Sequence, residues 1–399
     1  MGRSCPPLGG MRMVGDGLAG ASLRYSDGGR AKNRVFRPTA RMVLNAVALT
    51  ASAITSTACN GKGDSPKLIH LSVPQGALEA SIAPEHGGEL ASLRVRIRGQ
   101  WQELLYRGMN YSPAPGWTGK APVLWPATGR NFPNPVGSAQ QDALGWVFRG
   151  KTYPLPIHGF ARDQAWEVTG QGTCGNATWL RLVLHDNSMT RSVYPFGFSL
   201  TSDYILGGET LYLRQTVHAD TANDAAMPFS IGNHITFRVP LLAGGTGTTI
   251  ATPATKEVLN DATGRPTGQI RAVAFDAPRA LSDFTWIPAV PLSGYPQHGV
   301  FARVADASGI AVTVSHTEDT QPSGTPVLFN LWGDPQNGYF AAEPWVGKQN
   351  SLMTGDGTIS LAPGKSFQWT VAVQVTDRKA PADGAPTPPR CPIPETAGK

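Results

Sequence analysis

Apolar side chains recur at every second position through most of the chain from Leu68 onward. In "SLRVRIRG", Leu93, Val95 and Ile97 alternate with arginines, and "SFQWTVAVQV" repeats the pattern near the other end of the chain. A period of two sends one row of side chains into a core and the other toward water, which indicates half-buried strands. Further runs of this kind are "ATWLRLVLHD", "TLYLRQTVHA", "HGVFARVAD" and "IAVTVSH", separated by turn clusters such as "ADASG" and "LAPGK". We therefore expect an all-β fold, a large antiparallel sandwich with few short helices.

The 399 residues could make one large domain or two ordinary ones. No repeat of about 20 to 50 residues is visible, which argues against a propeller. One domain over residues 67–376 is the economical interpretation. The Pro-rich segment 377–399, "DRKAPADGAPTPPRCPIPETAGK", lacks apolar periodicity and predicts a disordered tail.

The net charge of +6 and pI of about 9.2 would suit a nucleic-acid binder, but the excess is confined to the start of the chain. Residues 1–66 hold nine Lys/Arg and three Asp, which leaves 25 basic and 25 acidic residues in the rest. The expected domain is thus neutral overall, and we expect no nucleic-acid partner.

Residues 1–66 have the pattern of a leader and linker. Within about 35–58, a basic stretch precedes a mildly apolar run and a small-residue exit, which predicts a signal peptide cleaved after Ala58. Cys59 would then come first, which suggests a lipid anchor, although Ser56 stands where a lipidation motif usually has a large aliphatic residue. We expect an exported protein, periplasmic or an outer-envelope lipoprotein. A buried apolar helix is the alternative interpretation of this run.

Cysteines and common motifs exclude several classes of site. Beside Cys59, only Cys174 and Cys391 would remain after export, too few for a disulfide framework, and no metal-binding spacing of Cys or His occurs. No Walker loop, Rossmann glycine fingerprint, HExxH or GxSxG is present. We therefore expect no metal and no nucleotide cofactor.

Three polar islands lie in otherwise strand-like sequence and carry the candidate site residues. Arg130, His158 and Arg162 lie in the first, His234 in the second and Glu343 in the third. The islands read "PVLWPATGRNFPN" with "YPLPIHGFARDQAWEV", then "MPFSIGNHITFRVP", then "NGYFAAEPWVGKQNS". Each residue also has a plain structural interpretation: a solvated loop arginine, a histidine bonded to backbone, or a carboxylate facing water.

Glu343 is the most informative of these residues. Its neighbours Phe340, Ala341, Ala342 and Trp345 are apolar, so the carboxylate should be partly desolvated. Desolvation raises a carboxyl pKa toward the range that suits a general base.

Taken together, the islands resemble the aldose 1-epimerase family, the galactose mutarotase-like group, including its hexose-6-phosphate epimerase-like branch. The likeness follows, in order, "GALEASIAPEHGGELASLRVR", "PVLWPATGR", "PLPIHGFARDQAWEV", "YPFGFSLTSDYILGGETLYL", "MPFSIGNHITF", "EPWVG" and "LAPGKSFQWTVAV". The resemblance implies a β-supersandwich with an open sugar cleft and no cofactor.

By position, the resemblance implies that His234 is a general acid and Glu343 a general base. His158 would contact the sugar near its ring oxygen, and Arg130 would bind sugar hydroxyls. In the phosphosugar branch, Arg162 would help to hold phosphate. An apolar face for stacking could come from Trp345, or from Trp125 or Trp166, with core packing as the alternative for each.

The chemistry of anomer exchange explains these residue types. The bond between C1 and the ring oxygen must break, so a base takes the C1 hydroxyl proton while an acid protonates the ring oxygen. After the aldehyde turns, the two groups exchange roles and the ring closes on the other face. The expected activity is therefore that of an aldose 1-epimerase acting on a free aldose, because an exported protein would rarely meet sugar phosphates.

Other interpretations stay open at this level. The "ITF" after "GNH" departs from many mutarotases, and Asp283 is only a guess for a further sugar-binding acid. A non-catalytic carbohydrate-binding protein of the cell envelope and a hexose-6-phosphate 1-epimerase are the main alternatives. A polysaccharide lyase or hydrolase is another, since related sandwiches host such activities. We expect a monomer or a dimer.

Overall fold

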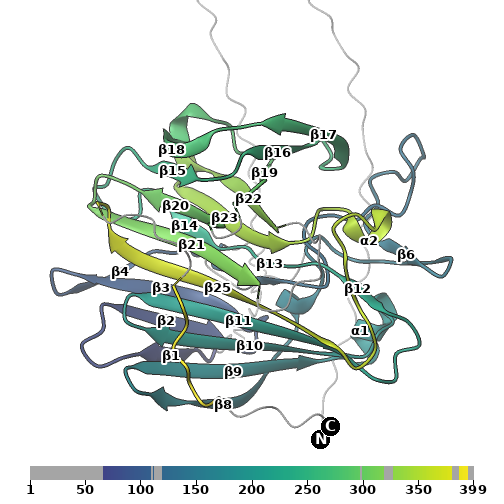
Figure 1. The fold of residues 1–399 in the computed structure, drawn as a ribbon, viewed down its shortest axis with the longest axis horizontal. Coiled ribbons are helices and arrows are strands. Elements are labelled where there is room, and N and C mark those ends of the chain that lie inside the picture. Colours follow the sequence, from purple (N-terminus) through teal and green to yellow (C-terminus); the bar gives the residue numbers. More distant parts are fainter. Residues whose placement is uncertain are drawn as a thin grey trace, which may run out of the picture. The chain divides into compact units, whose positions relative to one another are not determined.

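The computed structural model describes residues 66–108, 111, 119–296, 299–318, 327–379 and 386–393. The expected signal peptide and Cys59 lie outside the described residues. The strands within the sheets pair antiparallel throughout, and the described helices are short (Figure 1). The predicted all-β class is thus confirmed. None of the described helices is long and apolar enough to cross a membrane.

The largest sheet has nine strands and forms one layer of the fold. Its order is β18 (Phe275–Ala280), β15 (Thr249–Thr252), β20 (Phe301–Ala305), β21 (Ile310–Glu318), β25 (Ser366–Asp377), β11 (Thr210–Ala219), β10 (Phe198–Gly207), β9 (Ala177–His185) and β8 (Glu167–Cys174).

Two further sheets form the layer that faces it. An eight-stranded sheet contains β17 (Pro266–Ala272), β16 (Lys256–Asn260), β19 (Val290–Ser293), β22 (Val327–Asp334), β23 (Tyr339–Val346), β13 (Ile231–Asn233), β5 (Val123–Leu124) and, beside β23, β14 (Thr236–Arg238). A four-stranded sheet contains β1 (Ile69–Ser72), β2 (Leu78–Ala83), β3 (Glu89–Ile97) and β4 (Gln100–Glu103).

Small elements complete the fold. Two two-stranded sheets pair β12 (Met227–Phe229) with β24 (Ile359–Leu361) and β6 (Trp146–Phe148) with β7 (Lys151–Tyr153). The helices are α1 (Ser188–Val193), α2 (Ser351–Thr354) and the 3₁₀ turns η1 (Ala161–Asp163), η2 (Leu281–Asp283) and η3 (Pro335–Asn337).

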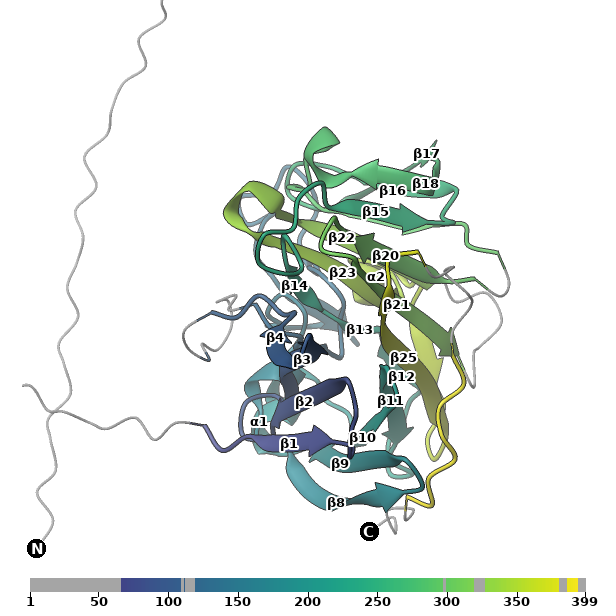
Figure 2. The same ribbon diagram turned by 90° about the vertical axis from the view of Figure 1, so that its left-hand side faces the viewer.

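The layers pack through the inward rows of the alternating strands. In β25, Phe367, Trp369, Val371 and Val373 are all buried and belong to one large apolar cluster that spans the sheets. In that cluster β1 and β2 lie against β9 and β10, while β23 lies against β21, as Figures 1 and 2 show. This double layer is the expected supersandwich, and it places the middle of β22 and β23 next to the loops that carry the first polar island.

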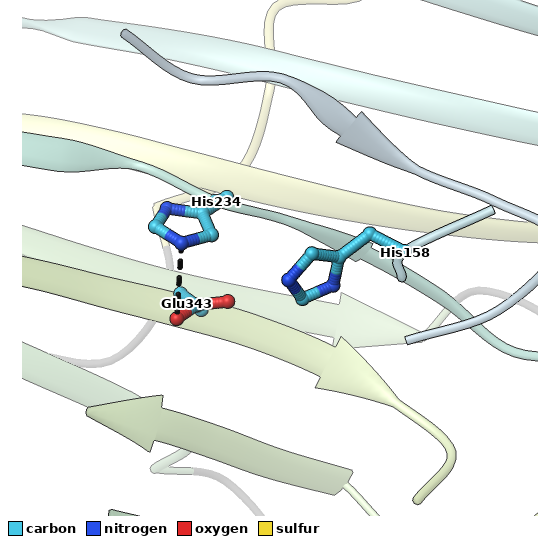
Figure 3. Close-up of side chains that lie close together, drawn as sticks. All are labelled: His158, His234 and Glu343. Carbon is cyan, nitrogen blue, oxygen red and sulfur yellow. Dashed lines mark ion pairs between the residues drawn. The ribbon is translucent and has the colours of Figure 1, made fainter. Parts of the chain in front are cut away.

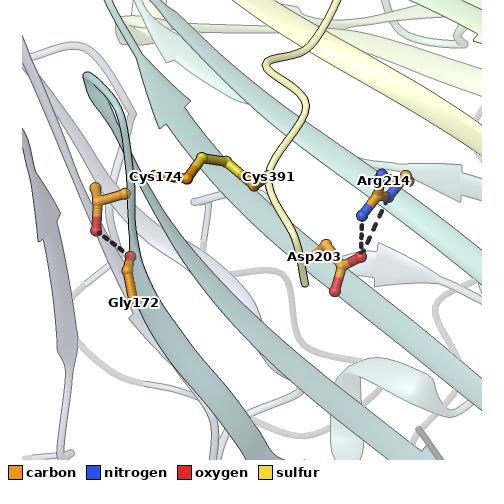
Figure 4. Close-up of a disulfide and its surroundings, with 6 residues drawn as sticks. Gly172, Cys174, Asp203, Arg214 and Cys391 are labelled. Atoms are coloured by element: carbon orange, nitrogen blue, oxygen red, sulfur yellow. Dashed lines mark hydrogen bonds and ion pairs between the residues drawn. A yellow bond between two sulfur atoms is a disulfide. The ribbon is translucent and has the colours of Figure 1, made fainter. Parts of the chain in front are cut away.

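The C-terminal segment 386–393 differs from the predicted disordered tail. Cys391 forms a disulfide with Cys174 at the end of β8 (Figure 4), and the Oη of Tyr212 donates to the carbonyl of Thr387 at 3.1 Å. Both Cys391 and Ile393 pack on an outward-facing apolar cluster, whose buried members are Ala177, Trp179, Ile205, Tyr212 and Ala372. The Pro-rich composition gives no sign of this bond, because it joins two cysteines that are 217 residues apart in sequence.

Candidate active site

A cleft of about 370 Å³ opens beside the eight-stranded sheet. Its floor is made by β22 and β23, and its walls come from the turns that contain the first polar island and from the β16–β17 turn. The lining residues are Arg130, Ile157, His158, Arg162, His234, Asn260, Ala262, Gly264, Ile287, Pro288, Ala289, Asn330, Trp332, Glu343, Trp345 and Gln349. The three sequence islands therefore meet in one place.

Glu343 lies in the middle of β23 and is only 1% exposed. Its Oε1 accepts a hydrogen bond from Asn330 Nδ2 at 3.0 Å, and its Oε2 accepts one from Trp345 Nε1 at 3.2 Å. Both donors are neutral, so no guanidinium or ammonium group balances the carboxylate directly. Burial raises the pKa of Glu343 to about 8, although the two hydrogen bonds act to lower it.

His234 follows directly on β13, where its backbone N–H bonds to the carbonyl of Pro122 at 3.0 Å. Its Nε2 lies 3.5 Å from Glu343 Oε1 (Figure 3), and its Nδ1 lies 3.1 Å from Thr236 Oγ1. Burial, with a smaller contribution from the charge of Arg162, lowers the pKa of His234 to about 3. The raised pKa of Glu343 and the lowered pKa of His234 favour a shared proton on the carboxyl group over one on the imidazole.

His158 lies in a tight turn with φ of 68°, in the left-handed region. The next residue, Gly159, also has positive φ, and a Cβ there would come within 2.2 Å of the Trp125 carbonyl oxygen, so only glycine fits. The backbone N–H of His158 donates to the carbonyl of Gly129, and the N–H of Gly129 donates to His158 Nδ1 at 3.0 Å. This turn aims the ring toward His234 and Glu343 (Figure 3).

The tautomer of His158 follows from that last bond. Because Nδ1 accepts a hydrogen bond, the hydrogen of the neutral ring lies on Nε2, which faces the cleft as a donor. Burial lowers the pKa of His158 well below its ordinary value, and His234, Arg162 and Arg130 lower it further, so the ring is neutral. His158, His234 and Glu343 are close enough together to hold a metal ion, but a hydrogen on Nε2 of His158 disfavours such a ligand set.

Arg130 and Arg162 lie at different depths in the cleft. Arg130 is exposed at the mouth of the cleft, beside Gln349 and Gly264. Arg162 lies in η1 and is half buried; its Nε and Nη2 are shielded from solvent, and neither has a hydrogen-bond partner among the described residues. Trp345, 2% exposed, stands edge-on to His158 with 5.9 Å between ring centres. All six predicted site residues thus line the cleft.

Three other candidates lie elsewhere. Trp125 is fully buried against Phe198, and Trp166 donates its indole N–H to the carbonyl of Ala161, so both belong to the core. Asp283 is exposed in η2 and is not part of the cleft lining.

Sequence reasoning missed Asn330, Trp332, Asn260 and Gln349. Asn330 had a detectable signal, because it is the lone amide in the apolar run "VLFNLWG" of β22. Trp332 packs edge-on to His234 at 5.4 Å between ring centres. Nothing local in the sequence distinguishes Asn260 or Gln349 from other loop residues.

Comparisons with known proteins agree with the fold. The family model described as aldose 1-epimerase matches residues 68–374. The structure is similar to that of the Slr1438 protein from Synechocystis sp. PCC 6803, at 29% identity and a TM-score of 0.63 over 79% of this chain and 97% of that one. A galactose mutarotase related enzyme from Lactobacillus acidophilus shares the fold at 22% identity and a TM-score of 0.60, over 79% of this chain and all (100%) of that one.

One curated relative is matched over a shorter stretch. It is a Salmonella typhimurium protein named "Putative glucose-6-phosphate 1-epimerase", 26% identical over 119 residues, or 29% of this chain. The matched part is 40% of the length of that relative. The family model covers most of the chain, and the chain therefore belongs to the aldose 1-epimerase family.

Proposed function

We propose that the protein is an aldose 1-epimerase that interconverts the α and β anomers of a hexose. The observation that carries this proposal is the buried pair of Glu343 and His234, 3.5 Å apart in a cleft that also presents the Nε2–H of His158. A carboxyl group and an imidazole held side by side, able to pass one proton between them, are what ring opening and closure require.

The sequence of proton transfers is short. In the reactive form, the Glu343 carboxylate takes the proton of the C1 hydroxyl, and the protonated His234 gives its Nε2 proton to the ring oxygen. The bond between C1 and the ring oxygen breaks and an aldehyde forms, which leaves a neutral His234 and a protonated Glu343. After the aldehyde rotates, the same transfers run backward on the other face. His158 Nε2–H is placed to donate to the sugar, and Trp345 and Trp332 border its apolar face.

Polarimetry of freshly dissolved α-D-glucose and α-D-galactose tests this proposal. Wild-type protein should accelerate the approach to equilibrium, and Glu343→Gln should relax at the uncatalysed rate. Equal rates for the two proteins with every sugar tried, phosphorylated sugars included, would eliminate the proposal. Binding of sugars without rate enhancement would support the non-catalytic carbohydrate-binding alternative instead.

A second candidate substrate is a hexose 6-phosphate, and Arg162 favours it. Two of its N–H-bearing atoms are buried without a partner among the described residues, and Arg130 adds a second positive charge at the mouth. Among the described residues that line the cleft, Glu343 is the only carboxylate, so an anionic sugar would meet little repulsion there. Buried donors of this kind gain most from an ionised acceptor.

The two substrates can be separated with one variant. We expect Arg162→Met to lose most of its kcat/KM for glucose 6-phosphate if phosphate binds there, roughly ten- to hundredfold, and far less for glucose. If both substrates lose activity equally, Arg162 serves the shared sugar ring, and the free aldose stays the substrate. Arg149→Met, at a surface ion pair with Asp224 on the far side of the β6–β7 hairpin, is the control for loss of one positive charge.

We also propose that the chain is exported, on the basis of its leader pattern and the Cys174–Cys391 disulfide. Structural disulfides persist in oxidising compartments and are rare in the cytosol. Expression of the full chain, followed by mass determination of the mature product, tests this. A product that begins near Cys59 supports export, a further mass of acyl chains on Cys59 supports the lipid anchor, and an uncleaved cytosolic product contradicts both.

A further inference from the structure

Asn330 is the residue directly opposite Glu343 in the ladder between β22 and β23. It is 6% exposed, and its amide nitrogen donates to Glu343 Oε1, the same oxygen that faces His234. The indole N–H of Trp345, two residues farther along β23, donates to the other oxygen. Both oxygens of Glu343 are therefore fixed, and the plane of the carboxyl group cannot rotate without breaking a buried hydrogen bond.

Thr236 plays the corresponding part beside His234. The residue is fully buried, and its hydroxyl donates to the carbonyl of His234 at 3.4 Å. With that hydrogen engaged, the hydroxyl oxygen accepts from Nδ1 of His234 at 3.1 Å. The neutral ring then carries its hydrogen on Nδ1 and presents the Nε2 lone pair to Glu343.

We propose that Asn330 and Thr236 are positioning residues for the single proton of the pair, which rests on Glu343 in the empty cleft and crosses to His234 when a sugar is bound: Asn330 stabilises the carboxylate that remains, and Thr236 orients the ring that receives the proton. This inference rests on the proposed function for its meaning in catalysis. The empty site then has the protonation that matches the open-chain aldose: Glu343 can donate to the aldehyde oxygen, and His234 Nε2 can accept from the freed hydroxyl. Opening a cyclic sugar requires the proton to cross first from Glu343 to His234.

The surrounding charges favour the proton on Glu343 while the cleft is empty. Arg162 from η1 and Arg130 from the first island line the cleft with the pair, and His158 faces it as a neutral ring. Arg162 disfavours a positive charge on His234. Besides Glu343, no carboxylate lines the cleft in the part of the chain that the structure describes. A bound sugar that shields His234 from Arg162 would ease the transfer.

The pH profile of kcat/KM tests the role of Asn330. The pair is active while it holds one proton, so wild-type activity should fall as the pH rises through about 8, where Glu343 loses that proton. Asn330→Leu removes a donor that favours the carboxylate, which should move this alkaline limb to higher pH. The plateau should fall roughly ten- to hundredfold, because the oriented carboxylate becomes harder to form. A lower plateau with an unmoved limb would indicate a merely structural residue and overturn the inference for Asn330.

Thr236 offers an isosteric comparison. Thr236→Val removes the acceptor of the Nδ1 hydrogen, and we expect kcat to fall about tenfold with little change in KM, while Thr236→Ser restores it. Thr190→Val is the matched control, because Thr190 is equally buried but its hydroxyl caps α1, where it accepts from the N–H of Asn187. Loss of kcat in both valine variants, or failure of serine to restore it, would count against Thr236.

A measurement on the wild-type protein reads the protonation of the pair directly, with Glu343→Gln used only to assign the carboxyl signal. Nitrogen-15 NMR of labelled histidine should show neutral His234 with its hydrogen on Nδ1, and carbon-13 NMR should show a protonated Glu343 carboxyl at pH 7, assigned by its loss in Glu343→Gln. A hydrogen on Nε2 of His234, or an ionised Glu343 at that pH, would overturn the inference. This readout stands even if no sugar is epimerised, so failure of the proposed function remains distinguishable.

Discussion

Asp203 and Glu343 are two carboxylates with the same burial, 1% exposed, in the two facing layers of one fold. Asp203 in β10 is held by two guanidinium groups. Arg181 donates to it at 2.6 and 2.8 Å. Arg214, drawn in Figure 4, donates to it at 2.8 and 3.2 Å. Glu343 receives two neutral N–H groups and faces a neutral histidine.

The different partners of the two carboxylates indicate a structural role for Asp203 and a chemical role for Glu343. A buried carboxylate held by two arginines is engaged in a structural ion-pair network. A buried carboxylate without a cationic partner has a pKa near the working pH, and it can both take and give a proton. Burial alone therefore identifies neither type of group; the partners do.

The largest predicted effect is on activity. Glu343→Gln keeps the shape of the side chain and its two donors but cannot take a proton, so mutarotation should fall by about 10²- to 10⁴-fold. Asp203→Asn, the matched carboxylate-to-amide change, should leave the rate within about twofold of wild type, because Asp203 lies outside the cleft lining. Polarimetry of both variants checks this, and a comparable loss in both would remove the distinction drawn here.

For stability, we expect the larger effect from Asp203→Asn and the smaller one from Glu343→Gln. Asp203→Asn leaves two partly buried guanidinium groups, 12% and 25% exposed, without their carboxylate, and should lower the free energy of unfolding by about 3 kcal/mol. Glu343→Gln should cost almost nothing. Chemical denaturation followed by tryptophan fluorescence measures both. An Asp203→Asn protein as stable as wild type would show that the network contributes little.

The nine-stranded sheet that contains Asp203 has a second stabilising feature, the disulfide between Cys174 and segment 386–393. Cys174→Ser should lower the free energy of unfolding by about 2 to 4 kcal/mol and leave mutarotation unchanged, because the bond lies away from the cleft. The double variant Cys174→Ser, Cys391→Ser should match the single one. If a reducing agent leaves the melting temperature of wild type unaltered, the bond does not stabilise the fold.

A further effect is a pH dependence of stability that belongs to Glu343. Its pKa is raised from 4.5 in the unfolded chain to about 8 in the folded protein, so the folded state binds more protons between these values. Stability should therefore decline as the pH rises through that window, and Glu343→Gln should remove this part of the decline. Melting temperatures of the two proteins at pH 5 and pH 8 provide the test; parallel changes would contradict a raised pKa.

Much of the fold was predictable because alternation is a local signal. The runs around Leu93 and Val371 became β3 and β25, and all six proposed site residues line one cleft. Glu343 stood out by its apolar neighbours, which is the property that raises its pKa.

What escaped prediction depends on pairing between distant segments. Asn330 matters only because β22 places it opposite Glu343, and Cys391 only because the chain end returns to β8. Trp125 and Trp166 are the same residue type as Trp345 but point into the core. A single sequence does not show on which side of a turn a tryptophan ring lies. Which side chains contact one another thus depends on how the sheets assemble.

The most direct test of the central claim is magnetisation transfer between the anomeric protons of a hexose at equilibrium, with wild type and Glu343→Gln side by side. We expect wild type to exchange the α and β signals of glucose or glucose 6-phosphate measurably faster than buffer alone, and Glu343→Gln to match the buffer. Exchange that is equally fast with both proteins, or absent with both for every hexose tried, would contradict Glu343 as the base of an anomer-exchanging site.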